Sequence, residues 1–531
     1  MISGIVSRVL PDKKCYKHFH ESKSPINNSE VMTSLITINN ALCRVGRHKS
    51  LKVEKLEIKQ GEHWCFFGPN GSGKSLLANL LAGRRIESGN YVHYSNGFEP
   101  RRDLHIVSFE EQQRLWERDN RLDISDYTDS ATDKGTSVLD LIKDSRPVKD
   151  EDQSLFDDLT EQLCLGPYLD KGIRFLSSGQ VRRVLIARAL YAFQPSSAQI
   201  LVLDDPLESI DIGSQRTIRD AISEFLKEDF SSIQLCRRPS DILPGITHMA
   251  VMKELEIIEH GSIESVETKE AYLHFLAHKP TLPNNIPEKM ISKHVAKERE
   301  PLIEMLDVKA SYGEIQIFKG FSWSMMPSDH VLIEGPNGCG KSTLLSLIDG
   351  ENHKAYGQNV TLFGCKKGSG ETIWDLKSKF GVVSNELHNK YIKGWRVLDV
   401  VVSGFFDSIG LYDDSGAKEK EMAAEWLSLF GIESLVKNYY HEVSFGQQRL
   451  VLLARAMVKK PKILILDEPC VGLDDYHRQL ILGVLDLIGK QTHTRLIYVS
   501  HVKEEKPSCI NSRLSFVPDD GGGYRIVTSS D

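Results

Sequence analysis

The stretch Gly68-Pro69-Asn70-Gly71-Ser72-Gly73-Lys74-Ser75 returns later in the chain as Gly335-Pro336-Asn337-Gly338-Cys339-Gly340-Lys341-Ser342. Each copy follows a largely apolar run and precedes an apolar helical pattern. In this spacing the backbone N–H groups and the lysine hold phosphate oxygens, and the serine is a ligand of magnesium. One copy alone has an alternative interpretation as a flexible turn. Two complete copies predict that both halves bind a nucleoside triphosphate, ATP, with Mg²⁺.

The composition indicates a globular protein without extensive nucleic-acid contacts. The chain has 531 residues, of which 40% are hydrophobic and 26% charged, enough for two large domains. The net charge of -7 argues against nucleic acid as a partner. The nine cysteines are scattered without a Cys-x-x-Cys pair, which favours a reducing compartment over disulfides or zinc. No apolar run approaches the roughly 18 residues of a membrane span.

The first residues form a pattern of their own. Apolar side chains between Ile2 and Leu10 recur at helical spacing and precede the basic residues Lys13 and Lys14. This pattern resembles a mitochondrial presequence, although Asp12 does not fit one. We therefore expect residues 1–33 to be an N-terminal extension and the protein to be mitochondrial. An unstructured tail on a cytoplasmic protein is the alternative.

The second half of the chain repeats the first. Lys341 follows Lys74 by 267 positions, and Asp467 follows Asp204 by 263, so the spacing hardly changes. A repeat of this length predicts two duplicated domains, at 34–266 and 301–531. Between them, residues 267–300 contain several prolines and asparagines, which predicts an exposed connector.

Strand patterns predict the fold class. The apolar runs 199–203 and 462–466 are typical of buried parallel strands, and the alternation at 35–38 indicates an antiparallel flank. Each domain is therefore predicted to be α/β.

Two further motifs come after the phosphate loops in the same order. Leu176-Ser177-Ser178-Gly179-Gln180 and Val443-Ser444-Phe445-Gly446-Gln447 each open a helical pattern, for which a serine N-cap is one explanation. They also resemble the Leu-Ser-Gly-Gly-Gln signature of ABC ATPases. The resemblance implies two tandem ABC domains, each with a RecA-like P-loop core, an antiparallel β flank and a helical subdomain. It also implies that each signature contacts the ATP held by the other domain.

Acidic residues end two of the apolar runs, as Asp204-Asp205-Pro206 and Asp467-Glu468-Pro469. By the resemblance, Asp204 and Asp467 hold magnesium together with Ser75 and Ser342, while Asp205 and Glu468 polarise the attacking water. His501 resembles the switch histidine that bridges the γ-phosphate and this water. Tyr312 lies where family members stack an aromatic ring on adenine.

The resemblance assembles these residues into two composite sites. Site one joins the first phosphate loop to the second signature, and site two joins the second loop to the first signature. The residues predicted to bind ATP are Gly68, Pro69, Asn70, Gly71, Ser72, Gly73, Lys74, Ser75, Gly335, Pro336, Asn337, Gly338, Cys339, Gly340, Lys341, Ser342, Thr343, Ser177, Gly179, Gln180, Ser444, Gly446, Gln447 and Tyr312.

The two sites are predicted to differ in activity. Site two has Glu468 and His501, whereas site one has Asp205 and no histidine near Arg237-Arg238. The shorter side chain withdraws the carboxylate by about 1.5 Å, and a misplacement of about 1 Å can cost 10²-fold. We expect site one to bind ATP and turn over slowly. The alternative is that Asp205 works normally.

Three strings outside the ATP motifs, at 368–376, 403–412 and 444–449, resemble the ModF group of molybdate-transport ATP-binding proteins. This implies an ATP motor for separate membrane-spanning subunits, docked on the helical regions 138–176 and 397–443, with Phe405 and Phe406 as candidate contacts. A switch acting on a soluble protein or ribosomal partner is the alternative. A regulator with negligible turnover fits poorly with the complete site two.

Two departures from the family pattern bear on these interpretations. The glutamine loop, which contacts transport partners in the family, reads Val383-Ser384-Asn385 in one domain and has no clear register around 108–113 in the other. Cys339 lies beside Lys341 at a helix N-terminus, which predicts a lowered thiol pKa and inactivation by alkylation. A small residue that fills the loop is the alternative role for this cysteine.

Overall fold

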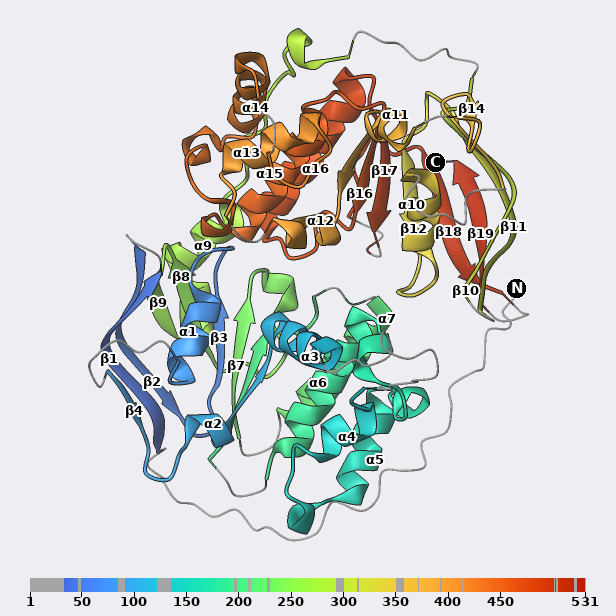
Figure 1. The fold of residues 1–531 in the computed structure, drawn as a ribbon. Helices are drawn as coiled ribbons and strands as arrows, with labels where there is room; N and C mark the ends of the chain where they lie inside the picture. Colours follow the sequence, from blue (N-terminus) through green and yellow to red (C-terminus); the bar gives the residue numbers. More distant parts are fainter. Residues whose placement is uncertain are drawn as a thin grey trace, which may run out of the picture.

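A computed structural model of the chain shows two domains of the same construction joined by a partly helical connector (Figure 1). The residues that the structure describes are 33–45, 49–84, 91–121, 135–194, 198–208, 210, 212–226, 230–292, 300–312, 315–349, 358–370, 372–391, 394–411, 415–500, 502, 505–519 and 523–530. The predicted N-terminal presequence lies outside these residues, except for Thr33.

Domain one is built on a sheet with the order β4-β1-β2-β9-β8-β3-β7-β6-β5. The strands β3, β5, β6, β7 and β8 are parallel, and β1, β2 and β4 form an antiparallel flank. The predicted parallel core and antiparallel flank are thus confirmed. The strands are β1 (Ser34–Val45), β2 (Lys49–Lys59), β3 (His63–Phe67), β4 (Val92–Tyr94), β5 (Leu104–Val107), β6 (Ile200–Asp204), β7 (Ser231–Cys236), β8 (His248–Lys253) and β9 (Glu256–Ser262).

Helices complete domain one on both sides of this sheet and form its helical subdomain (Figure 1). Their apolar faces are buried on the sheet or on one another, as amphipathic helices require. The helices are α1 (Lys74–Leu81), α2 (Pro100–Asp103), α3 (Phe109–Arg121), α4 (Val138–Lys143), α5 (Gln153–Gln162), α6 (Ser178–Ala192), α7 (Ile212–Phe225) and α8 (Ile263–Glu267).

Domain two repeats this plan with two separate sheets, ordered β15-β16-β17-β12-β18-β19 and β11-β10-β13-β14. The first contains the parallel core and the second is the antiparallel flank. The strands are β10 (Ile303–Tyr312), β11 (Ile315–Met325), β12 (Val331–Glu334), β13 (Asn359–Leu362), β14 (Cys365–Lys366), β15 (Phe380–Val383), β16 (Ile463–Asp467), β17 (Arg495–Ser500), β18 (Ser512–Pro518) and β19 (Tyr524–Ser530). The helices are α10 (Lys341–Asp349), α11 (Ile373–Lys377), α12 (Asn385–Lys390), α13 (Val397–Val402), α14 (Ala417–Leu429), α15 (Phe445–Met457) and α16 (Asp475–Gln491).

The connector is bound to both domains, which differs from the exposed segment that its composition predicts. Its helix α9 (Glu270–Ala277) places Tyr272 edge-on against Phe67 of domain one, with ring centroids 5.4 Å apart. Further along, Ile286 and Met290 are buried in the core of domain two. The prolines favour an extended path, but the apolar residues between them are covered by the domains.

Among the described helices, none has both the length and the apolar character required to cross a bilayer. In each domain, the phosphate loop and the acidic residues both lie at the carboxyl ends of parallel strands, where ligands bind in folds of this class.

Candidate nucleotide sites

The two phosphate loops follow β3 and β12 and lead into α1 and α10. Gly71 and Gly338 occupy the same position in the two loops and have the same φ of 78°. This left-handed conformation is accessible to glycine without strain. It turns successive backbone N–H groups toward one concave surface, which is the geometry that binds phosphate. The predicted loops are therefore formed in both domains.

Each loop lysine is buried against its own loop. The Lys74 ammonium group donates to the carbonyl oxygens of Gly68 at 2.7 Å and Pro69 at 2.9 Å. Lys341 makes the same pair of bonds, to Gly335 and Pro336, both at 2.9 Å. Burial lowers the pKa of Lys74, although the nearby carboxylates oppose this shift. An anion in the loop would offset the cost of burying this charge.

The predicted metal ligands meet at site one. Ser75 Oγ donates to Asp204 Oδ2 at 3.0 Å. Burial, with the neighbouring carboxylate as the next cause, raises the pKa of Asp204 to about 6, and the same causes raise that of Asp467 to about 6. A buried carboxylate beside a second one is electrostatically unfavourable unless a cation is bound. The oxygen-only donor set of serine and aspartate fits Mg²⁺, which retains waters in such sites.

The two candidate bases occupy equivalent positions. Asp205 and Glu468 both take left-handed φ values, 46° and 49°, directly after β6 and β16. Their N–H groups donate to Leu235 and Val499 in the adjacent strand, both at 3.2 Å. Because Leu235 of β7 and Val499 of β17 accept equivalent bonds, the residues that follow β7 can be aligned with those that follow β17.

That alignment places Arg237 at the position of His501, because Arg237 directly follows β7 and His501 directly follows β17. His501 lies outside the described residues, and so does the side chain of Tyr312. Their predicted roles remain predictions.

Both signature motifs form complete capping boxes. Ser177 Oγ accepts a hydrogen bond from Gln180 N, and Ser444 Oγ accepts from Gln447 N, both at 3.3 Å. The glutamine side chains bond back to the serine N–H groups at 2.9 Å. The N-cap interpretation is therefore correct for both serines. It is compatible with nucleotide binding, since such a helix N-terminus also attracts anions.

The described residues bring site one together across the domain boundary. Asn70 N donates to Asp474 Oδ2 at 2.7 Å, and Asn70 Nδ2 donates to Gly472 O at 2.8 Å. A Cβ placed on Gly71 would lie only 3.1 Å from Cβ of Ser444. The first phosphate loop thus directly faces the second signature and the loop before α16.

Site two is arranged differently. A Cβ placed on Gly338 would meet no described atom within 4 Å. Ser177, which the resemblance pairs with this loop, is therefore not against Gly338 in the way that Ser444 is against Gly71. The described residues bring the first phosphate loop against the second signature at site one, and they show no such contact at Gly338 of site two.

Comparisons with known proteins agree with this geometry. The protein-family model described as ABC transporter matches residues 51–208 and 318–471. The chain belongs to the ABC transporter family.

This ABC protein is 35% identical over 504 residues to the ABC transporter ATP-binding protein ModF of Escherichia coli, covering 93% of this chain and 99% of the relative. It is 25% identical to an uncharacterised ABC transporter ATP-binding protein of Schizosaccharomyces pombe, covering 91% and 98%. The fold is similar to archaeal ribosome recycling factor aABCE1, with TM-score 0.54, 18% identity and coverage of 92% and 90%. The tandem ABC fold and the resemblance to the ModF group are thereby confirmed, and ATP hydrolysis is the activity of this family.

The ABC glutamine-loop positions can now be assigned. Ser108 and Ser384 both follow a core strand, at the ends of β5 and β15, so Phe109 and Asn385 take the glutamine position. Phe109 is 48% exposed. Asn385 Oδ1 accepts a hydrogen bond from buried Arg449 of the signature helix. Neither position provides the glutamine of the ABC pattern.

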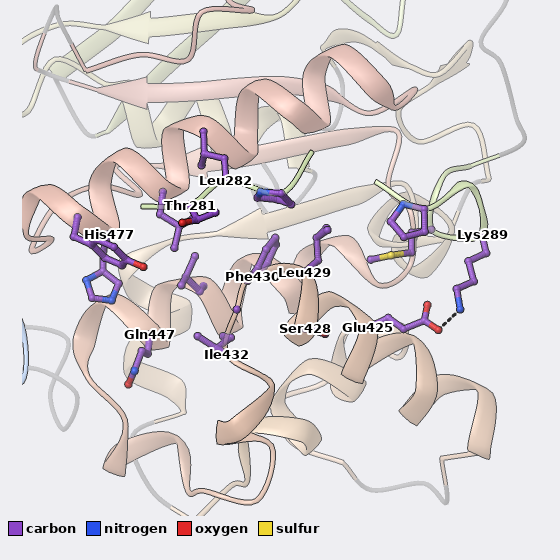
Figure 2. Close-up of a pocket in the computed structure, with 17 residues that line it drawn as sticks. Thr281, Leu282, Lys289, Glu425, Ser428, Leu429, Phe430, Ile432, Gln447 and His477 are labelled. Carbon is purple, nitrogen blue, oxygen red and sulfur yellow. Dashed lines mark hydrogen bonds and ion pairs between the residues drawn. The ribbon is translucent and has the colours of Figure 1, made fainter. Parts of the chain in front are cut away.

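The ABC signature of domain two also borders a pocket of about 740 Å³ between the connector and α14–α16 (Figure 2). Gln447 and His477 line one end of this pocket, and the ion pair between Lys289 and Glu425 lies at the other. His477 Nδ1 is 2.7 Å from Asp474 Oδ1. The connector is thus positioned beside the residues that close site one.

The lowered pKa predicted for the Cys339 thiol is wrong, whereas its inactivation by alkylation stays a prediction. Its side chain is only 2% exposed, and burial raises the pKa of the thiol. Lys341 and the loop N–H groups act in the opposite direction, but desolvation is the larger effect. The burial of Cys339 favours the alternative role, that of a small residue that fills the loop.

Proposed function

We propose that ATP hydrolysis in this protein takes place mainly at site two, while site one holds nucleotide as a lasting contact between the domains. The observation that carries this proposal is the contrast between Gly71, whose Cβ would meet Ser444, and Gly338, whose Cβ would meet none of the described atoms within 4 Å. A site that must admit ATP and release ADP in each cycle has to open. At site two, the described residues leave space beside the phosphate loop at Gly338.

The residues of site two fit this chemistry. Lys341 is held at the phosphate loop, and Ser342 and Asp467 offer oxygen ligands for Mg²⁺, which would neutralise phosphate charge when bound. Glu468 follows Asp467 and is the group that would polarise the attacking water. His501 would contact the γ-phosphate and hold this water in line, by the family resemblance.

Turnover and nucleotide retention in the full-length protein test this division. Glu468→Gln should lower the ATPase rate by about 10²-fold or more, since it removes the general base. Asp205→Asn should change the rate little, and one ATP per chain should stay bound in the Glu468→Gln variant. A large loss in Asp205→Asn with an unchanged Glu468→Gln would reverse the assignment of the two sites.

We further propose that closure of site two moves separate membrane-spanning subunits. The name of the ModF relative supports this hypothesis, and so does the surface of the helical subdomain. Phe406 is 37% exposed after α13, whereas Phe405 packs on the core. Of the two candidate contacts, Phe406 is therefore the better one.

Affinity capture with the Glu468→Gln variant, compared with Lys341→Ala, tests the partner class. ATP should close site two only in the first variant. A membrane-spanning protein recovered with that variant alone supports the transport hypothesis. Recovery of a soluble or ribosomal protein instead would support the alternative switch function.

We also propose a mitochondrial location, from the resemblance of the first residues to a presequence. Import of the full chain into isolated mitochondria tests it. The full chain is compared with a chain that lacks residues 1–33. Protection of the full chain alone from external protease supports the proposal, and equal cleavage of the two chains contradicts it.

A further inference from the structure

Arg237 lies at the centre of a charged cluster that spans the two domains. Its side chain is 11% exposed, and its Nε is 2.9 Å from Asp205 Oδ2. A second guanidinium nitrogen contacts the carboxylate of Glu208. The third donates to the carbonyl oxygen of Gly472, in the loop before α16 of domain two. One side chain therefore connects the candidate base of site one to the opposite domain.

The loop that receives this contact is shaped for close approach. Gly472 has φ 82°, and its carbonyl oxygen also accepts the bond from Asn70 Nδ2 at 2.8 Å. A Cβ on Gly472 would lie 2.4 Å from the ring of Phe445 and 2.8 Å from Glu208 Oε1. Only glycine lets the domains approach this closely here. One carbonyl oxygen of domain two is thus held by two donors from domain one.

Arg237 keeps its charge in the folded protein. Burial alone would lower the pKa of Arg237, but Asp205 and Glu208 act in the other direction and raise it overall. Charge-assisted contacts to a planar guanidinium are among the stronger polar contacts in proteins.

A lack of space for water beside Asp205 does not explain the slow hydrolysis that is predicted for site one. A cavity of about 20 Å³ lies beside Asp205, Glu208, Arg237 and Gly472, which is enough for roughly one water molecule. A water molecule therefore has room near the carboxylate. The difference from site two is the arginine that occupies the switch position and engages that carboxylate.

We propose that Arg237 is a positioning residue that gives site one both of its properties. It holds Asp205 in an ion pair, away from the role of base, and it fastens domain one to the Gly472 loop so that site one stays closed. This inference rests on the proposed division of labour between the sites, and it assigns that division to one side chain. A histidine could not contact all three partners at once, because it has two ring nitrogens.

The test uses the full-length protein with Glu468→Gln, so that site two is silent. The protein is loaded with labelled ATP, chased with unlabelled ATP, and followed for release and for hydrolysis of the label. Arg237→Ala should release nucleotide about 10-fold faster, because it removes a charge-assisted hydrogen bond that crosses the domain boundary. Arg237→Lys keeps the charge but not the planar guanidinium group, so its rate of nucleotide release should lie between that of the parent and that of Arg237→Ala.

Arg238→Ala is the matched control. It removes the same charge from the next position, where Arg238 Nε bonds to Asp241 of its own domain at 2.8 Å. Release from this variant should match the parent. If Arg237→Ala and Arg237→Lys both release nucleotide no faster than Arg238→Ala, the proposal is wrong. Arg237→Lys keeps the test decisive if the alanine variant does not fold.

A gain-of-function variant tests the effect of Arg237 on the candidate base separately from its contact with the Gly472 loop. In the same background, Arg237→His with Asp205→Glu restores the residue types of site two. The bound ATP should then be hydrolysed at least about 10-fold faster than with Asp205→Glu alone, as expected when a general base regains its role. Equal rates would contradict the effect of Arg237 on Asp205. Full turnover in the Glu468→Gln parent would instead contradict the proposed function itself.

Discussion

At the middle of each phosphate loop, Gly71 and Gly338 have the same φ of 78°, yet a Cβ on Gly71 would meet a signature serine and one on Gly338 would meet none of the described atoms within 4 Å. The loops themselves are nearly identical in sequence and in lysine contacts. The difference therefore arises from the surfaces that the two loops face. Asn70 bonds to Asp474 and Gly472, and Arg237 adds a second contact to the same loop.

This comparison shows that one duplicated motif can serve two purposes when its surroundings change. At site one, hydrogen bonds from Asn70 and Arg237 cross the domain boundary, and little rearrangement is needed to keep the domains together. At site two the described residues show no such contact at Gly338, so ATP can contribute its binding energy to closing the proposed site. A cycle in which one site holds and the other opens follows from this arrangement.

The loop lysines provide the largest test of the comparison. Lys341→Ala should lower ATP turnover by about 10²-fold, because it removes a fixed charge from the phosphates of the active site. Lys74→Ala, the matched variant, should lower turnover by less than about 5-fold and mainly weaken retention at site one. Turnover and bound nucleotide are measured on the same preparations. Equal losses of turnover would mean that both sites hydrolyse ATP.

Cross-linking tests closure directly. Gly71→Cys with Ser444→Cys should form a disulfide without nucleotide, because Cβ atoms 3.1 Å apart need little movement to reach the roughly 3.8 Å of a disulfide. Gly338→Cys with Ser177→Cys should cross-link only when ATP closes site two. Both pairs carry the same backbone strain, since the two glycines share one φ.

The exposed cysteines Cys164 and Cys365 are first replaced by serine, so that they do not compete for cross-linking. Gel mobility with and without ATP gives the fraction cross-linked in the Glu468→Gln background. Similar cross-linking of both pairs in the absence of nucleotide would remove the basis for treating the sites as different.

The parts of the molecule that could be predicted from sequence are those with a local shape. The phosphate loops, the signature caps and the acidic strand ends each depend on a few adjacent residues, and each is found where its motif lies. The parallel core followed in the same way from the apolar runs at 199–203 and 462–466. Such features need no knowledge of the partner surface.

The parts that could not be predicted depend on distant residues. The contact between Arg237 and Gly472 joins positions 235 residues apart, and no local pattern marks either of them as an interdomain residue. The lowered pKa predicted for Cys339 used its neighbours in sequence and not the burial that outweighs them. Likewise, Phe109 could be assigned to the glutamine position only when the end of β5 was known.

Two equivalent residues, one in each domain, give a smaller test, which concerns the dependence of stability on pH. His388 and Gln112 are equivalent, since their N–H groups donate to Ser384 and Ser108 at the same distance of 3.2 Å. His388 Nδ1 lies 2.9 Å from the hydroxyl of Tyr440, and burial lowers its pKa to about 4, with Arg449 contributing. A histidine whose pKa is lowered on folding stabilises the protein fully above about pH 6.5 and loses this contribution as the pH falls toward 4.

We therefore expect His388→Gln to reduce the loss of stability between pH 7.5 and 5 by about 1–2 kcal/mol, because glutamine does not titrate. Urea unfolding at the two pH values measures this difference. Gln112→His, the reciprocal variant in domain one, should increase the loss. If His388→Gln keeps the full acid sensitivity of the parent, the histidine is not the group responsible.

Cys339 provides the smallest expected effect. It is buried, with its raised thiol pKa, and Ser72 occupies the same position in the other loop. Iodoacetamide should modify it more slowly than exposed Cys365, since thiolate is the reactive form. Cys339→Ser should leave turnover within about 3-fold, as expected for a swap of similar volume. Rapid modification of Cys339, or a large loss of turnover in the serine variant, would show that this loop differs from the first in chemistry as well as in surroundings.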